Sequence, residues 1–234
     1  MQTVLVAPAD DRGTKVLLRE KLDEYRGRIA LVSSFGAESA VLLHMVASID
    51  SATPVIFLDT GKLFAETLEY RDQLAARLGL RDLRTARPEP ARIAEIDPAG
   101  TLWRSDPDVC CWQRKVEPLD EALAGFSAWI TGRKRYQGGV RRDLPLVEAG
   151  PDGRVKINPL ARWSADDIAR YFAEHGLPRH PLEARGYRSI GCTTCTRVAA
   201  PGEDPRAGRW DGSSKNECGI HLPRLVPAQR ELRP

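Results

Sequence analysis

Short runs of apolar residues alternate with longer segments of helical spacing along the first two thirds of the chain. Residues 29–32 and 54–58 are continuous apolar runs of strand length. Residues 40–49 lie between them with apolar side chains at helical spacing, and residues 63–78 predict a second helix that ends at Gly79. Continuous apolar runs are typical of strands that are buried on both faces. The pattern therefore predicts an α/β fold in which helices flank a parallel sheet.

Further elements of the same kind follow along the chain. Residues 80–85 and 128–131 predict a third and a fourth strand. Residues 146–157 contain two short apolar segments around an Asp-Gly pair, which predicts a hairpin near the edge of the sheet. Residues 164–176 predict a helix, because they begin with a serine N-cap and two acidic residues and end with a glycine.

Helical and strand periodicity disappears in the last quarter of the chain. Residues 177–234 are rich in Pro, Gly and Arg, and a segment of this length without periodicity is typically either functional or disordered. Three cysteines in it favour function. We therefore expect a helical lead-in over residues 1–28, an α/β body over residues 29–176 and a cysteine-bearing tail over residues 177–234 that belongs to the same domain.

Composition is that of an ordinary globular protein and excludes several classes of function. Of the 234 residues, 42% are hydrophobic and 29% are charged. The net charge of +3 is too small to indicate nucleic-acid binding. No apolar run approaches the ~20 residues that cross a bilayer, so we expect no membrane association. The first ten residues lack the pattern of a signal peptide, which predicts a cytoplasmic protein.

Basic residues concentrate in three loop-like segments, residues 133–135, 141–142 and 197–209. The default interpretation of each segment is an ordinary solvated surface. Alternatively, the three segments converge on one anionic small molecule. The sequence leaves both interpretations open.

Two predicted strands are followed by loops that suit an anionic ligand. Ser33-Ser34-Phe35-Gly36-Ala37-Glu38-Ser39 leads from the first strand into a helix, where hydroxyls and free backbone N–H groups face a bound anion. Residues 59–61, Asp-Thr-Gly, end the next strand, and ligands of open α/β sheets bind beyond the carboxyl ends of strands. Neither loop has the Walker A or the GxGxxG pattern. A plain serine-capped helix remains the alternative for the first loop.

Five cysteines supply the candidate chemistry. Cys110 and Cys111 are adjacent, Cys192 and Cys195 form a CxxC pair, and Cys218 stands alone. In a cytoplasmic protein a CxxC pair is more typical of metal binding or catalysis than of a disulfide. Adjacent cysteines suit an iron–sulfur cluster better than zinc, whose structural sites draw on spaced pairs. The spacing predicts a four-thiolate metal centre beside a separate reactive thiol.

Together these motifs resemble the assimilatory sulfonucleotide reductases. The resemblance rests on the loop 33–39, on Leu-Asp-Thr-Gly at 58–61, on residues 129–137 and on the signature Glu-Cys-Gly-Ile-His-Leu at 217–222, and it spans residues 31–222. It implies a PP-loop fold of the adenine nucleotide alpha-hydrolase type. The usual basic motif, Gly-x-Arg-Arg-x-Gln-Ser, differs here at Lys134 and Gly138.

Within that family, the Cys-Cys…CxxC set distinguishes two substrate classes. Enzymes that use adenosine 5′-phosphosulfate (APS) generally carry it with a [4Fe-4S] cluster, and enzymes that use the 3′-phosphorylated form (PAPS) generally lack it. The resemblance therefore implies an APS reductase that forms sulfite and AMP, with a cluster held by Cys110, Cys111, Cys192 and Cys195. We expect the cluster to act structurally and electrostatically.

The resemblance also implies roles for individual residues. Cys218 is the expected nucleophile, which forms an S-sulfocysteine that an external dithiol resolves. Thioredoxin or a glutaredoxin is the expected donor, because the chain has no further free thiol. His221 is expected to position the thiol or the ligand, and His44 to be structural. The residues expected to bind the phosphosulfate are Lys115, Arg135, Arg206 and Arg209, and those expected to form the rest of the substrate pocket are Ser33, Ser34, Gly36, Ser39, Asp59 and Gly61.

Three alternatives remain open at this point. The first is a PAPS or dual-specificity reductase. The second is an iron–sulfur PP-loop tRNA sulfurtransferase, although such enzymes typically have Ser-Gly-Gly-x-Asp-Ser in the loop. The third is a non-catalytic four-cysteine zinc module. The Gly-Ser-Ser segment at 212–214 further predicts that the tail opens for the thiol donor and closes over the substrate.

Overall fold

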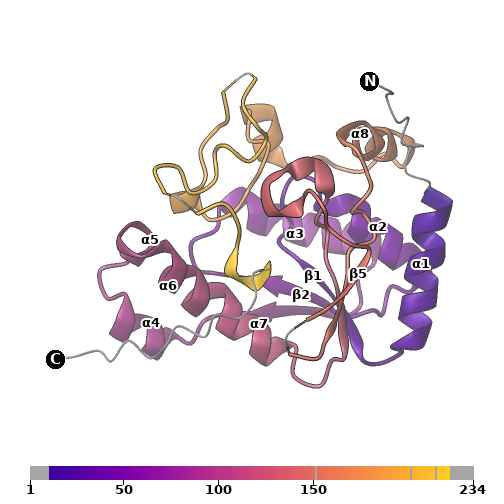
Figure 1. Ribbon diagram of the computed structural model, residues 1–234, viewed down its shortest axis with the longest axis horizontal. Helices are drawn as coiled ribbons and strands as arrows, with labels where there is room; N and C mark the ends of the chain where they lie inside the picture. The colour runs from indigo at the N-terminus through magenta and orange to yellow at the C-terminus, as the bar shows by residue number, and fades with distance from the viewer. Residues whose placement is uncertain (1–10, 151, 201, 214, 222–234) are drawn as a thin grey trace.

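A six-stranded sheet with helices on both faces forms the body of the protein (Figure 1). The computed structural model describes residues 11–150, 152–200, 202–213 and 215–221. The strands are β1 (Ile29–Ser33), β2 (Val55–Leu58), β3 (Leu83–Ala86), β4 (Ala128–Ile130), β5 (Val147–Ala149) and β6 (Val155–Ile157). The helices are α1 (Asp11–Glu24), α2 (Ser39–Ile49), α3 (Ala65–Leu78), α4 (Pro90–Ile96), α5 (Leu102–Ser105), α6 (Pro107–Cys111), α7 (Glu117–Ala122) and α8 (Ala165–Glu174).

The strand order is β3-β2-β1-β4-β6-β5. All neighbouring pairs are parallel except β5 and β6, which are antiparallel and pair Val147 with Ile157. The predicted edge hairpin and the predicted α/β fold class are therefore confirmed. None of the helices in the described part of the chain is long and apolar enough to cross a membrane.

The two faces of the sheet are covered by different helices. Ile29 and Leu31 of β1 belong to a large buried cluster with residues of α1, α2, α3 and α8. Ala30 and Val32 point to the other face, where they form a smaller cluster with Leu119 of α7. Because successive strand residues alternate between faces, a strand buried on both sides must be apolar throughout. This explains the continuous apolar runs of the sequence.

Several predicted boundaries were inexact. The third strand begins at Leu83 rather than at residue 80, and the second helix begins at Ala65 rather than at residue 63. Helix α8 has the predicted cap, because the Ser164 hydroxyl accepts from the backbone N–H of Asp167. The helices between residues 90 and 122 were not predicted. They are short and α5 buries no residue fully, so they lack a long apolar stripe.

The order of the strands reverses between β1 and β4. From β1 the chain proceeds to β2 and β3 on one side, and it then returns to place β4 and β6 on the other side. Helices on opposite sides of such a reversal leave a crevice outside the carboxyl ends of the two strands, and ligands of open α/β sheets bind there. The fold therefore places the candidate site at the ends of β1 and β4.

Candidate active site

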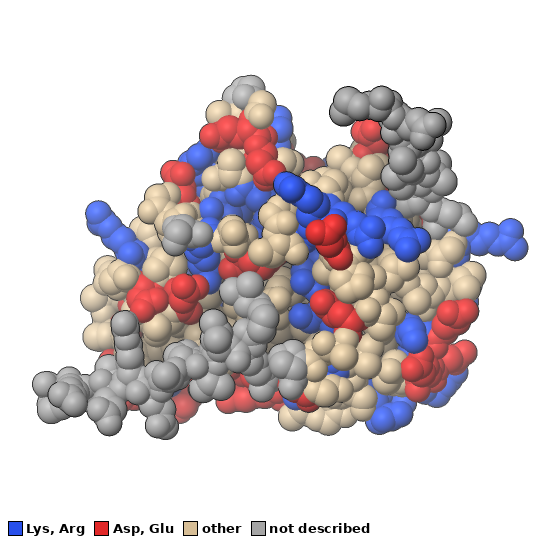
Figure 2. All heavy atoms as spheres, viewed as in Figure 1, with Lys and Arg blue, Asp and Glu red and all other residues tan. Residues whose placement is uncertain are grey.

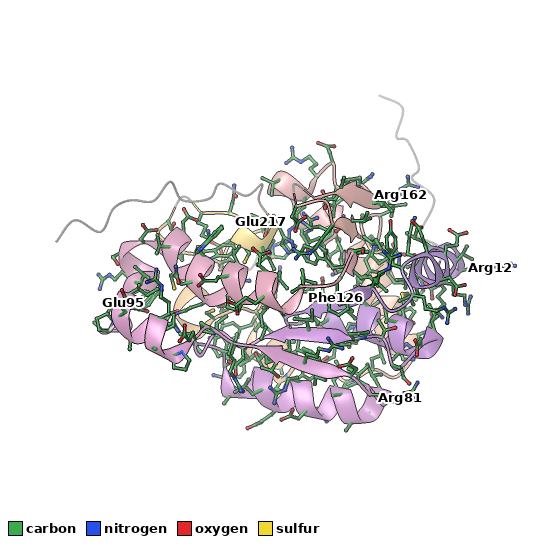
Figure 3. All side chains as sticks on the ribbon, turned by 90° about the horizontal axis from the view of Figure 1, so that it is seen from below. Arg12, Arg81, Glu95, Phe126, Arg162 and Glu217 are labelled. Atoms are coloured by element: carbon green, nitrogen blue, oxygen red, sulfur yellow. The ribbon has the colours of Figure 1, made fainter. Side chains whose placement is uncertain are left out.

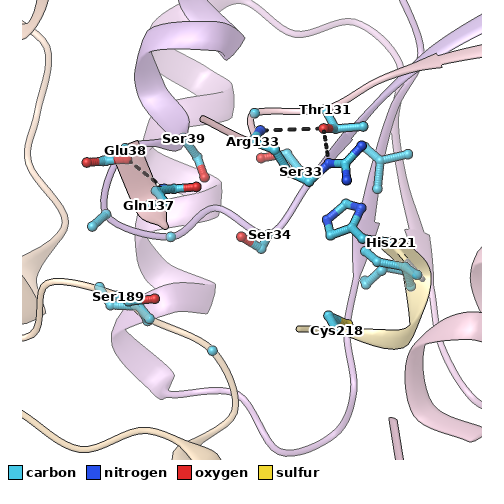
Figure 4. Close-up of a pocket in the computed structure, with 18 of the residues that line it drawn as sticks. Ser33, Ser34, Glu38, Ser39, Thr131, Arg133, Gln137, Ser189, Cys218 and His221 are labelled. Atoms are coloured by element: carbon cyan, nitrogen blue, oxygen red, sulfur yellow. Dashed lines mark hydrogen bonds between the residues drawn. The ribbon is translucent and has the colours of Figure 1, made fainter. Parts of the chain in front are cut away.

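A cavity of about 210 Å³ opens at the carboxyl ends of β1 and β4. Residues of the loops after these two strands form one side, and residues from 188–191, 206–210 and 217–221 form the other. Figure 4 shows Ser33 and Ser34 at the end of β1, with Cys218 and His221 approaching from the C-terminal segment. In Figure 2, Lys and Arg side chains gather in the hollow between the C-terminal loops and the turns that follow β4.

The loop after β1 has an unusual backbone at Phe35. This residue has a φ of 48°, which is uncommon for a bulky side chain. Its ring is fully buried and packs edge-on against Phe57 with 5.5 Å between ring centroids, and its N–H donates to the Ser33 hydroxyl at 3.2 Å. Burial of the Phe35 ring thus fixes a turn that leaves Ser34 and Gly36 lining the cavity.

Most residues that the sequence singled out for the pocket line this cavity. They are Ser33, Ser34, Gly36, Ser39, Lys115, Arg206, Arg209, Cys218 and His221. Asp59, Gly61 and Arg135 are absent from its wall. Asp59 accepts from the Gly61 N–H at 3.1 Å and from Arg87 at 3.0 Å, and Arg135 donates to the carbonyl of Leu144. The loop after β2 does reach the cavity through Thr60 and Leu63, but the Asp59 side chain is held outside it by Arg87.

Residues at the end of β4 contribute to the cavity as well. Thr131 and Gly132 line the cavity, together with Arg133 and Arg141. The motif at 129–137 contained most of these residues, but the order of the strands was not readable from the sequence. His44 lies outside the cavity, where its Nδ1 is 2.9 Å from the hydroxyl of Tyr171, as a structural histidine requires.

The three basic segments do converge on the cavity, but most of their charges are already paired. Arg133 contacts Glu148, the Lys134 ammonium donates to Glu38 at 2.8 Å, and Arg141 binds Glu217. All three basic side chains are buried. The cavity-lining cations outside these three ion pairs are Lys115, Arg188, Arg206 and Arg209, of which Arg206 also lies 3.4 Å from Glu217.

Arg209 is held in the cavity wall by the backbone around Gly191. Its Nη1 lies 3.5 Å from the carbonyl oxygen of Ile190, and its Nε lies 3.4 Å from that of Cys195. A Cβ atom at residue 191 would stand only 2.2 Å from Nη2 of Arg209. Glycine at this position therefore makes room for the guanidinium.

Cys218 faces a cationic environment. The pKa of the Cys218 thiol is lowered well below its usual range, and the largest cause is the interaction with the Cys111 thiol. The charge of Lys115 and the backbone N–H of Ile220 also lower this pKa, whereas burial raises it. Coordination of iron would remove the thiol proton of Cys111. Lys115 and Ile220 would still favour the Cys218 thiolate, which is the nucleophilic form.

The surroundings of His221 favour a neutral imidazole. Its pKa is lowered well below the usual range by burial and by the surrounding charges of Arg133, Arg141 and other cations. The ring stacks on Trp129 at 6.0 Å with an angle of 5° between the planes. Its Nδ1 is buried and has no hydrogen-bond partner within the described part of the chain. The predicted signature residue thus offers a free ring nitrogen beside Cys218.

The four cysteines predicted as ligands come from two segments that meet beside the cavity. Cys110 and Cys111 end α6, and the chain continues through a π-helical turn, Trp112–Val116, which carries Lys115. The CxxC turn is tied to the loop after β2, because the hydroxyl of Thr60 lies 3.2 Å from Sγ of Cys192. Three of the four thiols are buried, and Cys195 is partly exposed.

The two cysteine segments and Lys115 lie near enough to shift one another's pKa values. Burial raises the pKa of Cys110 to about 11, and Cys192 and Cys195 add to this effect. The pKa of Lys115 is raised although burial opposes the shift, because thiolates at Cys192, Cys218 and Cys111 favour its charged form. Lys115 is therefore the cation shared by the cysteine pairs and by Cys218.

The spacing of the thiols can be compared with the needs of a single metal ion. Tetrahedral zinc holds sulfurs at about 2.3 Å from the metal and hence about 3.8 Å from one another. Among the described residues, which include all four cysteines, no three of these Sγ atoms lie within 4.8 Å of one another. No three of these thiols are therefore gathered around one point as a tetrahedral zinc ion requires, and four thiolates are the donor set that an iron–sulfur cluster uses.

Two residues of the predicted C-terminal motifs lie outside the residues that the structure describes. Leu222 closes the signature at 217–222, and Ser214 belongs to the predicted hinge at 212–214. The described part of the signature forms a 3₁₀ turn, Gly219–His221, that packs against the segment Trp112–Val116.

Comparison with known proteins identifies the family. The model of the phosphoadenosine phosphosulfate reductase domain matches residues 28–198, which is more than half of the chain. The chain belongs to this family. The match contains Lys115 and the four clustered cysteines, and it ends before Arg206, Arg209 and Cys218.

Individual members of the family are closely similar. A protein of Mesorhizobium japonicum named adenosine 5′-phosphosulfate reductase is 54% identical over 208 residues, which are 89% of this chain and 82% of that protein. One of the same name from Chelativorans sp. strain BNC1 is 56% identical over 200 residues, 85% of this chain and 81% of that protein. The crystal structure of phosphoadenylyl-sulfate reductase from Candida auris superposes with a TM-score of 0.69 and 26% identity, and it covers 83% of this chain and 93% of that one.

Proposed function

We propose that this protein reduces APS to sulfite and AMP in assimilatory sulfate reduction. The observation that carries the proposal is a signature cysteine, Cys218, that faces a cation-lined cavity at the switch point of a nucleotide-binding sheet. The names of the relatives that are 54% and 56% identical support APS as the substrate.

The cavity has parts that suit each portion of APS. Leu42, Leu43 and Leu63 give it an apolar region that suits a purine base. The serines after β1 and the adjoining helix α2 suit a phosphate. Lys115, Arg206 and Arg209 offset the charge of the phosphosulfate, which would otherwise repel an approaching thiolate.

The first chemical step is a displacement at sulfur. The thiolate of Cys218 forms a bond to the sulfur of the sulfate group, and the bond from that sulfur to the bridging oxygen breaks. The electron pair leaves with the phosphate of AMP. The product is AMP and an S-sulfonated Cys218, in which the transferred group has not yet gained electrons.

The reduction itself comes from an external dithiol. A thiolate of thioredoxin or a glutaredoxin attacks Sγ of Cys218 and expels sulfite, and the donor's second thiol then resolves the mixed disulfide. The donor is oxidised to a disulfide and supplies both electrons. We place the reaction in the cytoplasm, where such donors are kept reduced.

Cys110, Cys111, Cys192 and Cys195 would hold a [4Fe-4S] cluster. The four-thiolate donor set and the adjacent pair Cys110-Cys111 support this assignment over a zinc site. When bound, the cluster would fix α6 to the CxxC turn and contribute to the electrostatic field at Lys115. Lys115 itself lines the cavity, so it orients the charge of the substrate from the cluster side.

A direct comparison of the two sulfonucleotides tests the proposed substrate. We expect kcat/KM for APS to exceed that for PAPS by at least ~10-fold, which is about 1.4 kcal/mol of transition-state discrimination. Equal values would reject APS specificity and leave a dual-specificity reductase. Absence of sulfite release from both substrates would reject the reductase activity.

A further inference from the structure

The segment that carries Cys218 is attached to the cavity wall through the carboxylate of Glu217. This side chain is only 1% exposed. It accepts hydrogen bonds from Nε and Nη2 of Arg141 at 2.5 and 2.8 Å, and its Oε1 also accepts from the backbone N–H of Cys218 at 2.9 Å. Nη2 of Arg206 lies 3.4 Å from the same oxygen. One buried carboxylate therefore joins three separate parts of the site.

A carboxylate in this place needs an explanation. Glu217 lines a cavity whose proposed ligand is a polyanion, so its charge opposes ligand binding. Burial disfavours its ionised form, yet the hydrogen bonds and charges of Arg141 and Arg206 outweigh burial and lower its pKa. The carboxylate is thus charged and already bound by its neighbours, which leaves it unsuited to act as a general acid or base.

Its contacts instead fix the backbone next to the thiol. Arg141 belongs to the turn Gly139–Arg141 and also donates to Gln137, so its guanidinium is held from two sides. On the far side of Cys218, a Cβ at Gly219 would lie 3.0 Å from Cγ2 of Val116, which shows how closely this segment approaches the helix. Figure 3 shows Glu217 beside the ribbon of the C-terminal turn, whereas Arg81 and Glu95 lie at the periphery of the molecule.

We propose that Glu217 is a positioning residue: its carboxylate, held by Arg141, fixes the backbone of Cys218 so that the thiol faces the cavity. The inference rests on the proposed function, in which Cys218 is the nucleophile. Arg206 couples this ion pair to the ligand, because its guanidinium contacts Glu217 and also lines the cavity.

The test compares Glu217→Gln with wild type in a single turnover without reductant. Glutamine keeps the shape of the side chain and loses the charge that holds the two arginines. We expect formation of the S-sulfonated protein at saturating APS to slow by ~50-fold, which is about 2.3 kcal/mol. The affinity for AMP should change by less than ~3-fold, because AMP binding does not need the thiol. Amide hydrogen exchange should accelerate in the peptide that contains Cys218 and stay unchanged elsewhere.

Matched variants separate positioning from a general loss of stability. Asp167 is also a buried carboxylate, but it caps α8 outside the cavity wall, so Asp167→Asn should lower stability without slowing sulfonation. Glu217→Asp keeps the charge and shortens the reach, and we expect an intermediate rate. In Glu217→Gln combined with Arg141→Gln, the rate should fall no further than in Glu217→Gln alone, because the two residues act as a unit.

The outcomes are distinct for this inference and for the proposed function. If Glu217→Gln forms the adduct at the wild-type rate, or loses AMP affinity in parallel with rate, Glu217 does not position Cys218. If wild type forms no adduct with APS, the proposed function fails. In that case the exchange measurement still decides whether Glu217 holds the segment, since unchanged exchange in Glu217→Gln would overturn the inference.

Discussion

The thiol groups of Cys111 and Cys218 interact with each other, so that the pKa of Cys218 is lowered and that of Cys111 is raised. One of these residues is a proposed cluster ligand and the other is the proposed nucleophile. The C-terminal 3₁₀ turn packs on the helical segment that follows Cys111, and this packing brings the two sulfurs together. The proposed metal centre and the proposed nucleophile would therefore be parts of one site.

Removal of any one of the four clustered thiols should disrupt the metal centre. We expect Cys110→Ala, Cys111→Ala, Cys192→Ala and Cys195→Ala each to lose most iron and sulfide and to bleach the broad absorption near ~400 nm. Thermal stability should fall as well, because metal binding joins two separate segments. Cys218→Ala is the control, and it should keep its colour. Full iron and sulfide content in the four variants would contradict the assignment.

Lys115 should contribute to the reaction chiefly by interacting with the sulfate group of APS. Lys115→Gln removes a cation that lies beside Cys218 and lines the cavity. We expect kcat/KM for APS to fall by ~100-fold, about 2.7 kcal/mol, whereas affinity for AMP should change little because AMP has no sulfate. Lys21→Gln, on α1 and outside the cavity, is the matched control. A parallel loss of AMP and APS binding would indicate a general role in the pocket.

The guanidinium of Arg209 packs directly against Gly191, so a larger residue at position 191 should disturb substrate binding by Arg209. Gly191→Ala would place a methyl group 2.2 Å from the present position of Nη2, so the guanidinium must move. We expect KM for APS to rise by ~10-fold while iron content stays unchanged. Arg209→Lys should give a similar rise, because lysine lacks the planar fork. An unchanged KM in both variants would show that Arg209 does not hold the substrate.

The lowered pKa of Lys156 leads to a prediction of how the free energy of unfolding depends on pH. This residue is buried with its Nζ 4.7 Å from the ring centroid of Trp129, and burial, aided by Arg133, lowers its pKa to about 8. An unfolded lysine titrates near ~10.4. Between these values the unfolded state binds more protons, so stability rises as pH increases.

Denaturant unfolding at pH 7.5 and 9.5 measures this effect. We expect wild type to gain about 2 kcal/mol more than Lys156→Met between these pH values. The variant lacks the titrating group and so lacks this part of the rise. The same pH dependence in both proteins would show that Lys156 has an ordinary pKa.

The sequence predicted the sheet well because buried parallel strands leave continuous apolar runs. It also identified the loop after β1 and the five cysteines, since their residue types are rare and closely spaced. It could not reveal the strand order, and the expectation for Asp59 rested on β2 as the neighbour that shares the site. The structure places Thr60 of the loop after β2 and Thr131 at the end of β4 in the cavity, whereas Asp59 pairs with Arg87 outside it.

The sequence also could not show which basic side chains pair with acidic ones. Arg133 and Arg141 belong to the predicted basic segments, but their partners Glu148 and Glu217 lie 15 and 76 residues further along the chain. Only the folded structure shows which cations are neutralised. The same limit applies to Glu217. The sequence shows this residue as part of a signature, but its contacts depend on the turn Gly139–Arg141, which lies far from it in the sequence.

The central claim is that Cys218 attacks the sulfur of APS. The most direct test is intact-mass analysis and peptide mapping of wild type after incubation with APS and without reductant. We predict that the protein gains the mass of one sulfonate group, located on the peptide with Cys218, and that Cys218→Ser gains none and releases no sulfite. An adduct on another cysteine, or turnover of Cys218→Ser with thioredoxin, would contradict the mechanism.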